Sequence, residues 1–430
     1  MKFILHCFFL IIFFTKNASS LEFEEIKSDK GINFWFVEDK SVPIISISFS
    51  FGGGAFNDPQ GKEGLSNLMT SLLDEGTSKM TSIDFKQSMK LNGVKLSFST
   101  QKDKVAGTFQ VISSNKKKGF QLLFEAINDP SFDKNAILKV KNQIQSSIKI
   151  DESNISNLAS MKFNENFYKN HNFSRINKGT IESLRKIKRR DIKDIHKKNL
   201  SLSNLTLGVS GDISKNEIGK FVDLVFGELP RFDKNEDIPK FKSLKVGKKI
   251  FNIETPQTAV VFGQQGLERN NEEFFAARIA NYILGGGSFQ SRLYKNVREK
   301  KGLVYSIYSY LLPYKNDGVI VGGFQTRNES VNKVIKMVRD EWKRIKRKSI
   351  SKEELDNAKT YFKGSFSRNY TSTMSIASLL EIVQYYSLGK DYFIKRDEII
   401  DKLDTDYVNN VASKIFDDKK LFFMIVGKPN

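Results

Sequence analysis

An arginine and a tyrosine that lie seven positions apart, Arg298 and Tyr305, are the side chains with the most direct chemical use. A guanidinium presents a planar fork of N–H donors that grips carbonyl or carboxylate oxygens, and a phenol donates to an oxygen that gains negative charge. A structural interpretation is also open. Arg298 lies in a charged segment, 295–301, and Tyr305 shares a β-prone stretch with Tyr308 and Tyr310, where alternation along a strand would make it a packing residue.

Three consecutive glycines precede this pair, and they allow two interpretations. Gly285, Gly286 and Gly287 follow an apolar helical stretch, so they could form a helix C-terminus and a tight turn. They could equally line a binding site. They do not form a phosphate-binding loop, because no Gly-Lys-Ser/Thr sequence follows them.

The sequence offers little to a transition metal. Its single cysteine, Cys7, lies near the start, and beyond the first residues the histidines are His171 and His196. Disulfides and thiolate metal sites are thereby excluded from the rest of the chain. We interpret both histidines as surface or turn residues, and we predict no metal or other cofactor in this chain.

The first residues are typical of an export signal. Lys2 precedes an apolar run over residues 3–14, and the small residues Ala18 to Ser20 follow. The run is shorter than the roughly 20 apolar residues that cross a bilayer. We therefore predict a signal peptide that is removed after about Ser20, with an uncleaved anchor as the alternative. No later stretch resembles a membrane span, so the mature chain is not expected to be an integral membrane protein.

The net charge of +20 does not by itself indicate nucleic acid. The densest basic cluster, within residues 185–198, lies on a predicted helix and lacks the glycine and aromatic residues of an RNA-binding sheet. A solvated basic face is the better interpretation, and we predict no nucleic-acid partner.

The elements that must position these residues occur twice along the chain. Three β-prone runs each have a counterpart roughly 210 residues further on, which indicates a duplicated unit. The pairs are 44–51 with 258–262, 93–99 with 302–308, and 205–212 with 421–428. Within each unit a strand, helices, a hairpin, long amphipathic helices and a final strand follow one another.

This order predicts an α+β protein with two homologous lobes in a clam-shell arrangement, each a mostly antiparallel sheet covered by helices. The predicted domains are a signal peptide at 1–20, an N-terminal lobe at 21–228, a linker at 229–249 and a C-terminal lobe at 250–430. The linker is assigned from its Lys, Asp, Asn and Pro content.

Several motifs now make a family resemblance specific. In the second unit these are Leu-Gly-Gly-Gly-Ser-Phe-Gln-Ser-Arg-Leu at 284–293 and Val-Arg-Glu-Lys-Lys-Gly-Leu-Val-Tyr-Ser at 297–306. In the first unit they are the helix that ends in Gly76-Thr77, Asn-His-Asn at 170–172 and Gly179-Thr180. Together they resemble the pitrilysin/insulinase family of zinc peptidases, which includes the mitochondrial processing peptidases. The resemblance covers nearly all of the mature chain.

The first lobe departs from that family where it matters most. Active members carry an inverted motif, H-x-x-E-H, whose histidines bind zinc and whose glutamate is the general base. The corresponding positions here are Asn67, Thr70 and Ser71, and the third ligand position falls near Ser147. Neutral amide and hydroxyl groups are weak zinc ligands, and Thr70 has no carboxylate to accept a proton. This chain is therefore not expected to be a zinc peptidase by itself.

The second lobe keeps the family's other half-site. The resemblance implies that Arg298 and Tyr305 contact the substrate across a cleft that Gly285, Gly286 and Gly287 line. Some bacterial members divide these halves between two chains, so we predict a non-catalytic, substrate-binding subunit of an exported, periplasmic heterodimeric zinc metallopeptidase. A homologous partner would supply the zinc, and a peptide would be the substrate. The alternative is a structural or peptide-binding homologue that has lost proteolysis altogether.

Overall fold

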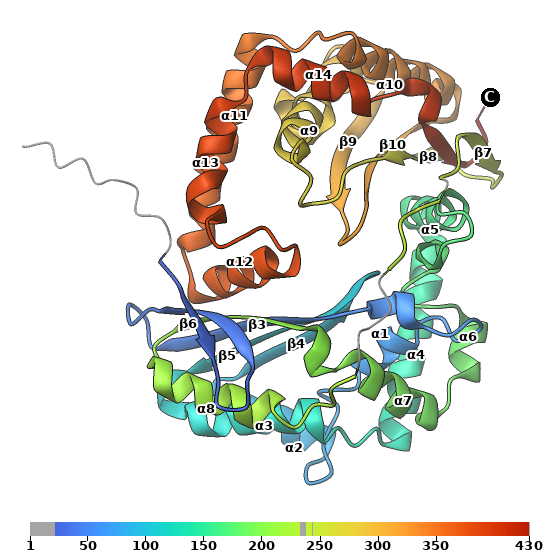
Figure 1. The fold of residues 1–430 in the computed structure, drawn as a ribbon. Coiled ribbons are helices and arrows are strands. Elements are labelled where there is room, and N and C mark those ends of the chain that lie inside the picture. The colour runs from blue at the N-terminus through green and yellow to red at the C-terminus, as the bar shows by residue number, and fades with distance from the viewer. Residues whose placement is uncertain (1–21, 233–237, 243, 430) are drawn as a thin grey trace, which may run out of the picture.

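The computed structural model describes residues 22–232, 238–242 and 244–429 (Figure 1). The predicted signal peptide lies outside these residues. The described chain forms two sheets covered by helices, which confirms the predicted α+β class. The first sheet has the order β1-β2-β6-β3-β5-β4, and the second has the order β7-β11-β8-β10-β9.

Eleven strands form these sheets in the described residues. In the first sheet they are β1 (Glu24–Lys27), β2 (Asn33–Glu38), β3 (Ile44–Gly52), β4 (Lys95–Thr100), β5 (Lys104–Ile112) and β6 (Leu205–Gly211). In the second they are β7 (Gly247–Phe251), β8 (Gln257–Gln265), β9 (Val304–Pro313), β10 (Gly318–Arg327) and β11 (Phe422–Val426).

The two sheets repeat one topology, as the sequence predicts. Strand β2 pairs with β6 in parallel, and β7 pairs with β11 in parallel. The strands that follow in each order are antiparallel, ending at the edge strands β4 and β9. Strand β1 is the extra member, because nothing in the second sheet corresponds to it. The domain boundaries proposed from the sequence remain a prediction.

The described helices fall on both sides of the sheets. In the first half they are α1 (Leu65–Thr70), α2 (Ser82–Leu91), α3 (Lys116–Asn128), α4 (Lys134–Ser153), α5 (Ile155–Phe167), α6 (Ile181–Lys186), α7 (Arg189–Asn199) and α8 (Lys215–Phe226). In the second half they are α9 (Phe274–Asn281), α10 (Val331–Lys346), α11 (Lys352–Phe366), α12 (Thr373–Tyr385), α13 (Tyr392–Lys402) and α14 (Thr405–Ile415).

Each half contributes one helix to the sheet of the other half. Helix α12 packs on β6 and β3 of the first sheet, and α5 packs on β8 and β11 of the second. In Figure 1 both helices lie between the lobes, α12 on the left and α5 on the right. The lobes are therefore joined by two exchanged helices and not merely by a linker.

The alternation in β3 explains how its sheet is covered on both faces. Its apolar residues Ile45, Ile47, Phe49 and Phe51 enter the core of the first lobe. Its serines point the other way: Ser46 Oγ lies 2.7 Å from Thr373 Oγ1, and Ser50 donates to Glu381. Since successive side chains of a strand face opposite sides, this run gives one apolar face and one polar face that receives α12.

Helix α12 lies close enough to β6 to require a glycine there. A Cβ atom on Gly208 would lie 2.2 Å from the carbonyl oxygen of Ala377. The amide of Gln384 donates to the carbonyl of Leu207 at 2.9 Å, so the helix is also fixed by a polar contact. A side chain at position 208 would push the exchanged helix off the sheet.

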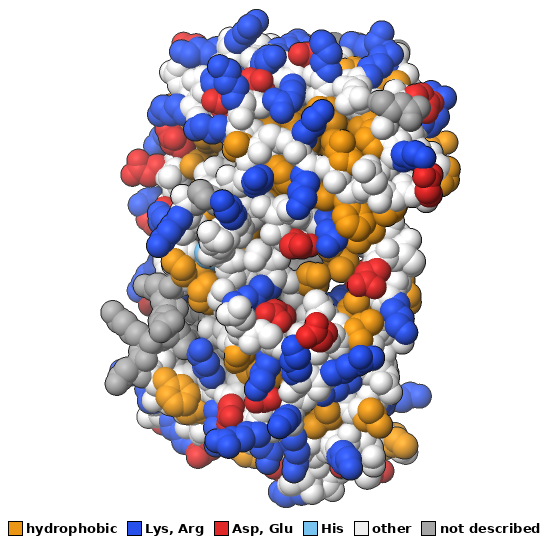
Figure 2. All heavy atoms as spheres, turned by 90° about the vertical axis from the view of Figure 1, so that its right-hand side faces the viewer, with side chains coloured by type: hydrophobic (Ala, Val, Ile, Leu, Met, Phe, Trp, Pro, Cys, Tyr) orange, Lys and Arg blue, Asp and Glu red, His pale blue; other side chains and the backbone are white. Residues whose placement is uncertain are grey.

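Basic and acidic side chains are interspersed on the face that Figure 2 shows, with lysines and arginines scattered over it and acidic residues between them. Within the described residues, no helix combines the length and the hydropathy that a membrane crossing requires.

Candidate functional site

Helix α1 is held at its start by a buried carboxylate. The carboxylate of Asp58 accepts the backbone N–H of Gly64 and of Ser66, each at 2.8 Å, and the Ser66 hydroxyl at 2.6 Å. Burial outweighs these hydrogen bonds and raises the pKa of Asp58 to about 6. The helix therefore keeps a fixed position although it is short.

The degenerate motif residues on α1 direct their hydroxyl groups back to the chain. Thr70 and Ser71 both donate to the carbonyl oxygen of Asn67, at 3.0 and 2.8 Å, and Thr70 lies 3.0 Å from the Thr100 hydroxyl of edge strand β4. In such back-bonding each hydroxyl donates its hydrogen to a backbone carbonyl of the preceding helical turn. These oxygens are neutral and already engaged, so they do not form a metal site.

Ser147, near which the predicted third zinc-ligand position falls, lies beside a lysine ammonium. Ser147 on α4 accepts a hydrogen bond from the Lys178 ammonium at 2.8 Å, and the same ammonium pairs with Asp151 at 2.6 Å. Within the described part of the chain, no group of three His, Cys, Asp or Glu side chains could hold a metal ion. The residues at the family's zinc position do not fit zinc.

Arg298 lies in a π-helical turn, Tyr294–Glu299, that precedes β9. Its guanidinium lies over the Tyr294 ring, 4.7 Å from the ring centre, and donates to the Tyr294 hydroxyl. Phe289 packs on that tyrosine edge to face, with ring centres 5.0 Å apart. Arg298 makes no ion pair with any residue that the structure describes, so its remaining N–H donors are available to a ligand.

Tyr305 is 82% exposed, which excludes the packing interpretation for this residue. The pairing of β9 with β10 explains its direction. Val304 pairs with Thr326 and Ile307 with Phe324, so Tyr305 and Ser306 together face one residue of β10. Such a β-bulge turns side chains out of the regular alternation and is frequent beside active sites.

The turn between Arg298 and Tyr305 depends on a glycine. Gly302 has a φ of 59°, a left-handed conformation that favours glycine. Its N–H donates to the Arg298 carbonyl at 2.9 Å, and the N–H of Leu303 donates to the Val297 carbonyl at 3.2 Å. The two candidate residues are therefore joined by a short hydrogen-bonded turn.

The glycine run has a packing reason. A Cβ atom on Gly285 would lie 2.4 Å from the Ser309 hydroxyl of β9, and one on Gly287 would lie 2.9 Å from the Tyr282 carbonyl. Asn281 fastens the same loop by a hydrogen bond to the Ser309 carbonyl at 2.9 Å. Close approach to β9 accounts for Gly285, and close approach to the preceding helical turn accounts for Gly287.

Three of the predicted site residues, Arg298, Gly285 and Gly286, line one hollow of about 210 Å³. It is lined by Gly285, Gly286, Ser288, Phe289, Tyr294, Arg298, Ser306, Ile307, Tyr308 and Tyr310. Gly287 and Tyr305 do not line it. The hollow is smaller than the roughly 300 to 1,000 Å³ of small-molecule pockets, and its size suits a single side chain.

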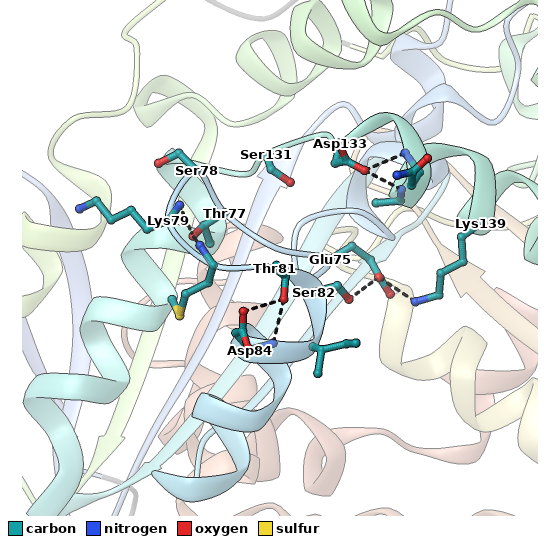
Figure 3. A pocket seen from close by; sticks show the side chains of 14 residues that line it. Glu75, Thr77, Ser78, Lys79, Thr81, Ser82, Asp84, Ser131, Asp133 and Lys139 are labelled. Carbon is teal, nitrogen blue, oxygen red and sulfur yellow. Dashed lines mark hydrogen bonds and ion pairs between the residues drawn. The ribbon is translucent and has the colours of Figure 1, made fainter.

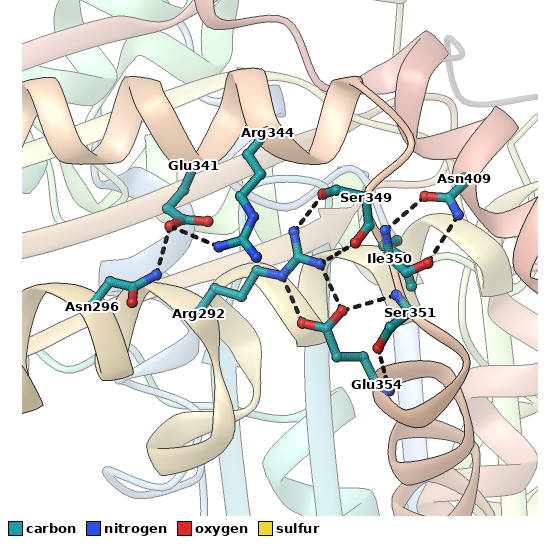
Figure 4. A network of polar contacts seen from close by, with 9 residues as sticks. All are labelled: Arg292, Asn296, Glu341, Arg344, Ser349, Ile350, Ser351, Glu354 and Asn409. Carbon is teal, nitrogen blue, oxygen red and sulfur yellow. Dashed lines mark hydrogen bonds and ion pairs between the residues drawn. The ribbon is translucent and has the colours of Figure 1, made fainter.

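A buried arginine anchors the segment that carries Arg298 (Figure 4). The guanidinium of Arg292 forms a bidentate ion pair with Glu354, with N–O distances of 2.7 and 2.6 Å. It also donates to the hydroxyl and to the carbonyl oxygen of Ser349, each at 2.8 Å. Glu354 also accepts the N–H of Ser351 in the capping box of α11. The arginine therefore couples the segment that carries Arg298 to the start of α11.

Replacing Arg292 by lysine should lower the free energy of unfolding by about 2 kcal/mol, because an ammonium cannot reproduce the planar fork. Urea denaturation measures this change. Arg347→Lys, at an exposed arginine nearby, is the control and should change it by less than about 0.5 kcal/mol. Equal effects of the two substitutions would refute the anchoring role.

The two histidines take part in hydrogen bonds to backbone. His171 Nε2 lies 3.1 Å from the Pro239 carbonyl and His196 Nε2 lies 2.9 Å from the Ile127 carbonyl. Burial lowers the pKa of both rings. Neither lies with other metal-binding side chains.

A separate hollow of about 820 Å³ lies between residues 77–84 and the start of α4 (Figure 3). No predicted site residue lines it. Glu75 at its wall accepts from Lys139 at 2.8 Å and from Ser82 at 2.7 Å, and it pairs with Lys86. Burial raises the pKa of this carboxyl, but the three hydrogen bonds together outweigh burial and lower it to about 2.

Glu75 should therefore stabilise the fold in a pH-dependent way. Because the pKa of Glu75 is lower in the folded chain, its contribution to stability is fully present above pH 4.5, the ordinary pKa of a glutamate. That contribution is lost as the pH falls to about 2. Glu75→Gln should cost about 2 kcal/mol at pH 6, a value reduced because both lysines are half exposed. The cost should shrink between pH 4.5 and 2 in urea titrations. A cost that stays constant over this range would contradict the assignment, and Glu182→Gln in an exposed pair is the control.

The fold and the site define a class of protein: a duplicated α+β chain whose first lobe, where the structure describes it, has no metal-binding group, and whose second lobe presents an exposed tyrosine and an arginine without an ion pair among the described residues. Residues 35–180 match the insulinase domain of peptidase family M16, and residues 186–362 match the domain described as the peptidase M16 inactive domain. The chain belongs to peptidase family M16, the insulinase family.

Relatives agree with this assignment. A non-peptidase homolog, YmxG, from Helicobacter pylori is 28% identical over 367 residues, covering 85% of this chain and 84% of its own. An uncharacterized zinc protease, YmxG, from Bacillus subtilis is 26% identical over 394 residues, covering 90% and 94%. The solved peptidase M16 inactive domain from Pseudomonas fluorescens has the same fold, with a TM-score of 0.90 and 24% identity over 95% of this chain and 98% of that chain.

Proposed function

We propose that this chain is the non-catalytic, substrate-binding subunit of an exported heterodimeric zinc metallopeptidase that acts on peptides. The observation that carries the proposal is the exposed Tyr305 on its bulge, seven residues after an Arg298 that has no carboxylate partner among the described residues. A chain that served only as a scaffold would have no use for an exposed phenol and for a guanidinium without an ion pair among the described residues, joined by one short turn.

The partner supplies what this chain lacks. In the proposed heterodimer a homologous chain with an intact H-x-x-E-H motif would hold zinc, which would supply Lewis-acid activation of water. Arg298 orients the main chain of the peptide with its free N–H donors, and Tyr305 donates a hydrogen bond to the oxygen that becomes negative as the tetrahedral intermediate forms.

An extended peptide fits this arrangement. Strand β9 is the edge of its sheet, so its outer N–H and C=O groups have no neighbouring strand among the described residues. A peptide could add to such an edge by main-chain hydrogen bonds, while side-chain pockets select its sequence. We propose a periplasmic or otherwise exported location for the complex, which the predicted export signal supports.

Assembly with a zinc-motif homologue tests the proposal. The mature chain and a homologue from the same organism that carries H-x-x-E-H should sediment as a one-to-one complex containing one zinc. Two chains that sediment independently, with each tested homologue, would leave the inactive structural or peptide-binding homologue as the better account.

A further inference from the structure

A cation of the protein itself lies beside Ser147, the predicted third ligand position of the first lobe. The ammonium of Lys178 lies 2.8 Å from the hydroxyl of Ser147, at the third ligand position, and 2.6 Å from a carboxylate oxygen of Asp151 one turn further along α4. The amide of Asn157 donates to the other oxygen of Asp151 at 3.0 Å. A positive charge therefore lies beside the residue that would have to provide the metal's carboxylate.

The backbone of Lys178 is held against the start of α1, the helix of the other ligand positions. A Cβ atom on Gly64 would lie 2.4 Å from the Lys178 carbonyl, and one on Gly179 would lie 2.0 Å from the Glu63 carbonyl. Both glycines have positive φ, 89° and 74°. The Ser183 hydroxyl adds a hydrogen bond to the Glu63 carbonyl at 2.7 Å. Lys178 thus starts beside α1 and ends on α4, so it bridges the two helices.

We propose that the Lys178 ammonium is the resident cation of this site, and that it excludes zinc independently of the missing ligands. It would pair with any carboxylate introduced at position 147 and so compete with a metal ion for that ligand. The inference is independent of the proposed function, because it concerns the first lobe whether or not a partner exists.

A double-mutant cycle in the full mature chain tests the charge. Ser147→Glu should increase the folding equilibrium constant about tenfold while Lys178 is present, because the new carboxylate gains an ion pair in a half-buried position. In the Lys178→Met background the same substitution should lower that constant, since the carboxylate then faces Asp151 without a cation. Ser146→Glu, at the exposed neighbouring position on α4, is the matched control and should show no dependence on Lys178.

Zinc affinity gives a second readout. Asn67→His, Thr70→Glu, Ser71→His and Ser147→Glu together restore the family's donor set. Competition with a chromogenic chelator should give an affinity at least about 100-fold higher when Lys178→Met is added to these four. Equal zinc affinity with and without Lys178, or a double-mutant cycle without coupling, would overturn the proposal. If the restored variants do not fold, the double-mutant cycle alone decides the question.

Discussion

Substituting Arg298 by alanine should lower kcat/KM of the assembled heterodimer about 10²- to 10³-fold, and Tyr305→Phe should lower it by a similar factor. Both groups would act on charge and orientation in the transition state, so kcat should fall more than KM rises. The expected loss for Tyr305 is large because phenylalanine keeps the ring and removes the one atom that donates. A quenched peptide substrate measures both effects.

The two substitutions should leave folding and assembly intact. Tyr305 is 82% exposed and Arg298 contacts chiefly one tyrosine, so the free energy of unfolding should stay within about 0.5 kcal/mol of that of the unmodified chain. Tyr407→Phe, at another exposed tyrosine on α14, is the control and should leave activity unchanged. A heterodimer with full activity after Arg298→Ala and Tyr305→Phe would contradict the role of the pair.

Breaking the buried pair between the lobes should give the largest loss of stability. Lys104 on β5 and Glu381 on α12 lie 3.1 Å apart with side chains 8% and 5% exposed. The Lys104 ammonium also lies 4.3 Å from the centre of the Tyr385 ring, and Ser50 donates to Glu381. Glu381→Ala should lower the free energy of unfolding by about 3 to 5 kcal/mol, because it leaves a buried ammonium without a partner.

Two comparisons separate this effect from simple loss of packing. Lys104→Met combined with Glu381→Leu should recover most of the stability, since a well-packed apolar pair replaces a buried ion pair at little cost. Lys336→Ala breaks an exposed pair with Asp340 and should cost less than about 1 kcal/mol. If the double substitution is as destabilising as Glu381→Ala, the pair does not act as described.

The fold was predictable from the sequence because its signals are local and repeated. The alternation of isoleucine or phenylalanine with serine in β3 predicts a strand with two different faces, and the constant spacing of three strand pairs predicts the duplication.

The exchanged helices were not predictable in the same way. Helix α12 follows the second hairpin in sequence, yet it packs on the first sheet through contacts such as Lys104 with Glu381, 277 residues apart. Periodicity identifies a helix and its apolar face but not the sheet that receives it. Which sheet receives the helix is decided by tertiary contacts that the sequence pattern does not contain.

The site was predictable at the level of residue types and not of geometry. Sequence motifs identify Arg298 and Tyr305 as candidates. They also show that Asn67 and Thr70 occupy positions where active members carry a zinc ligand and the general base, and these residues do not fit zinc. The bulge that exposes Tyr305 depends on register with β10, and the ammonium of Lys178 beside Ser147 depends on the packing of a loop on α1. Neither follows from spacing along the chain.

The central claim is that this chain holds half of an active site, and the most direct test compares hydrolysis of a quenched peptide library by three samples. These are the chain alone, the zinc-motif homologue alone, and the two together. Activity that arises in the mixture and is abolished by a chelator is the predicted result. A homologue that is equally active without this chain, or a stable complex that cleaves no peptide, would contradict it.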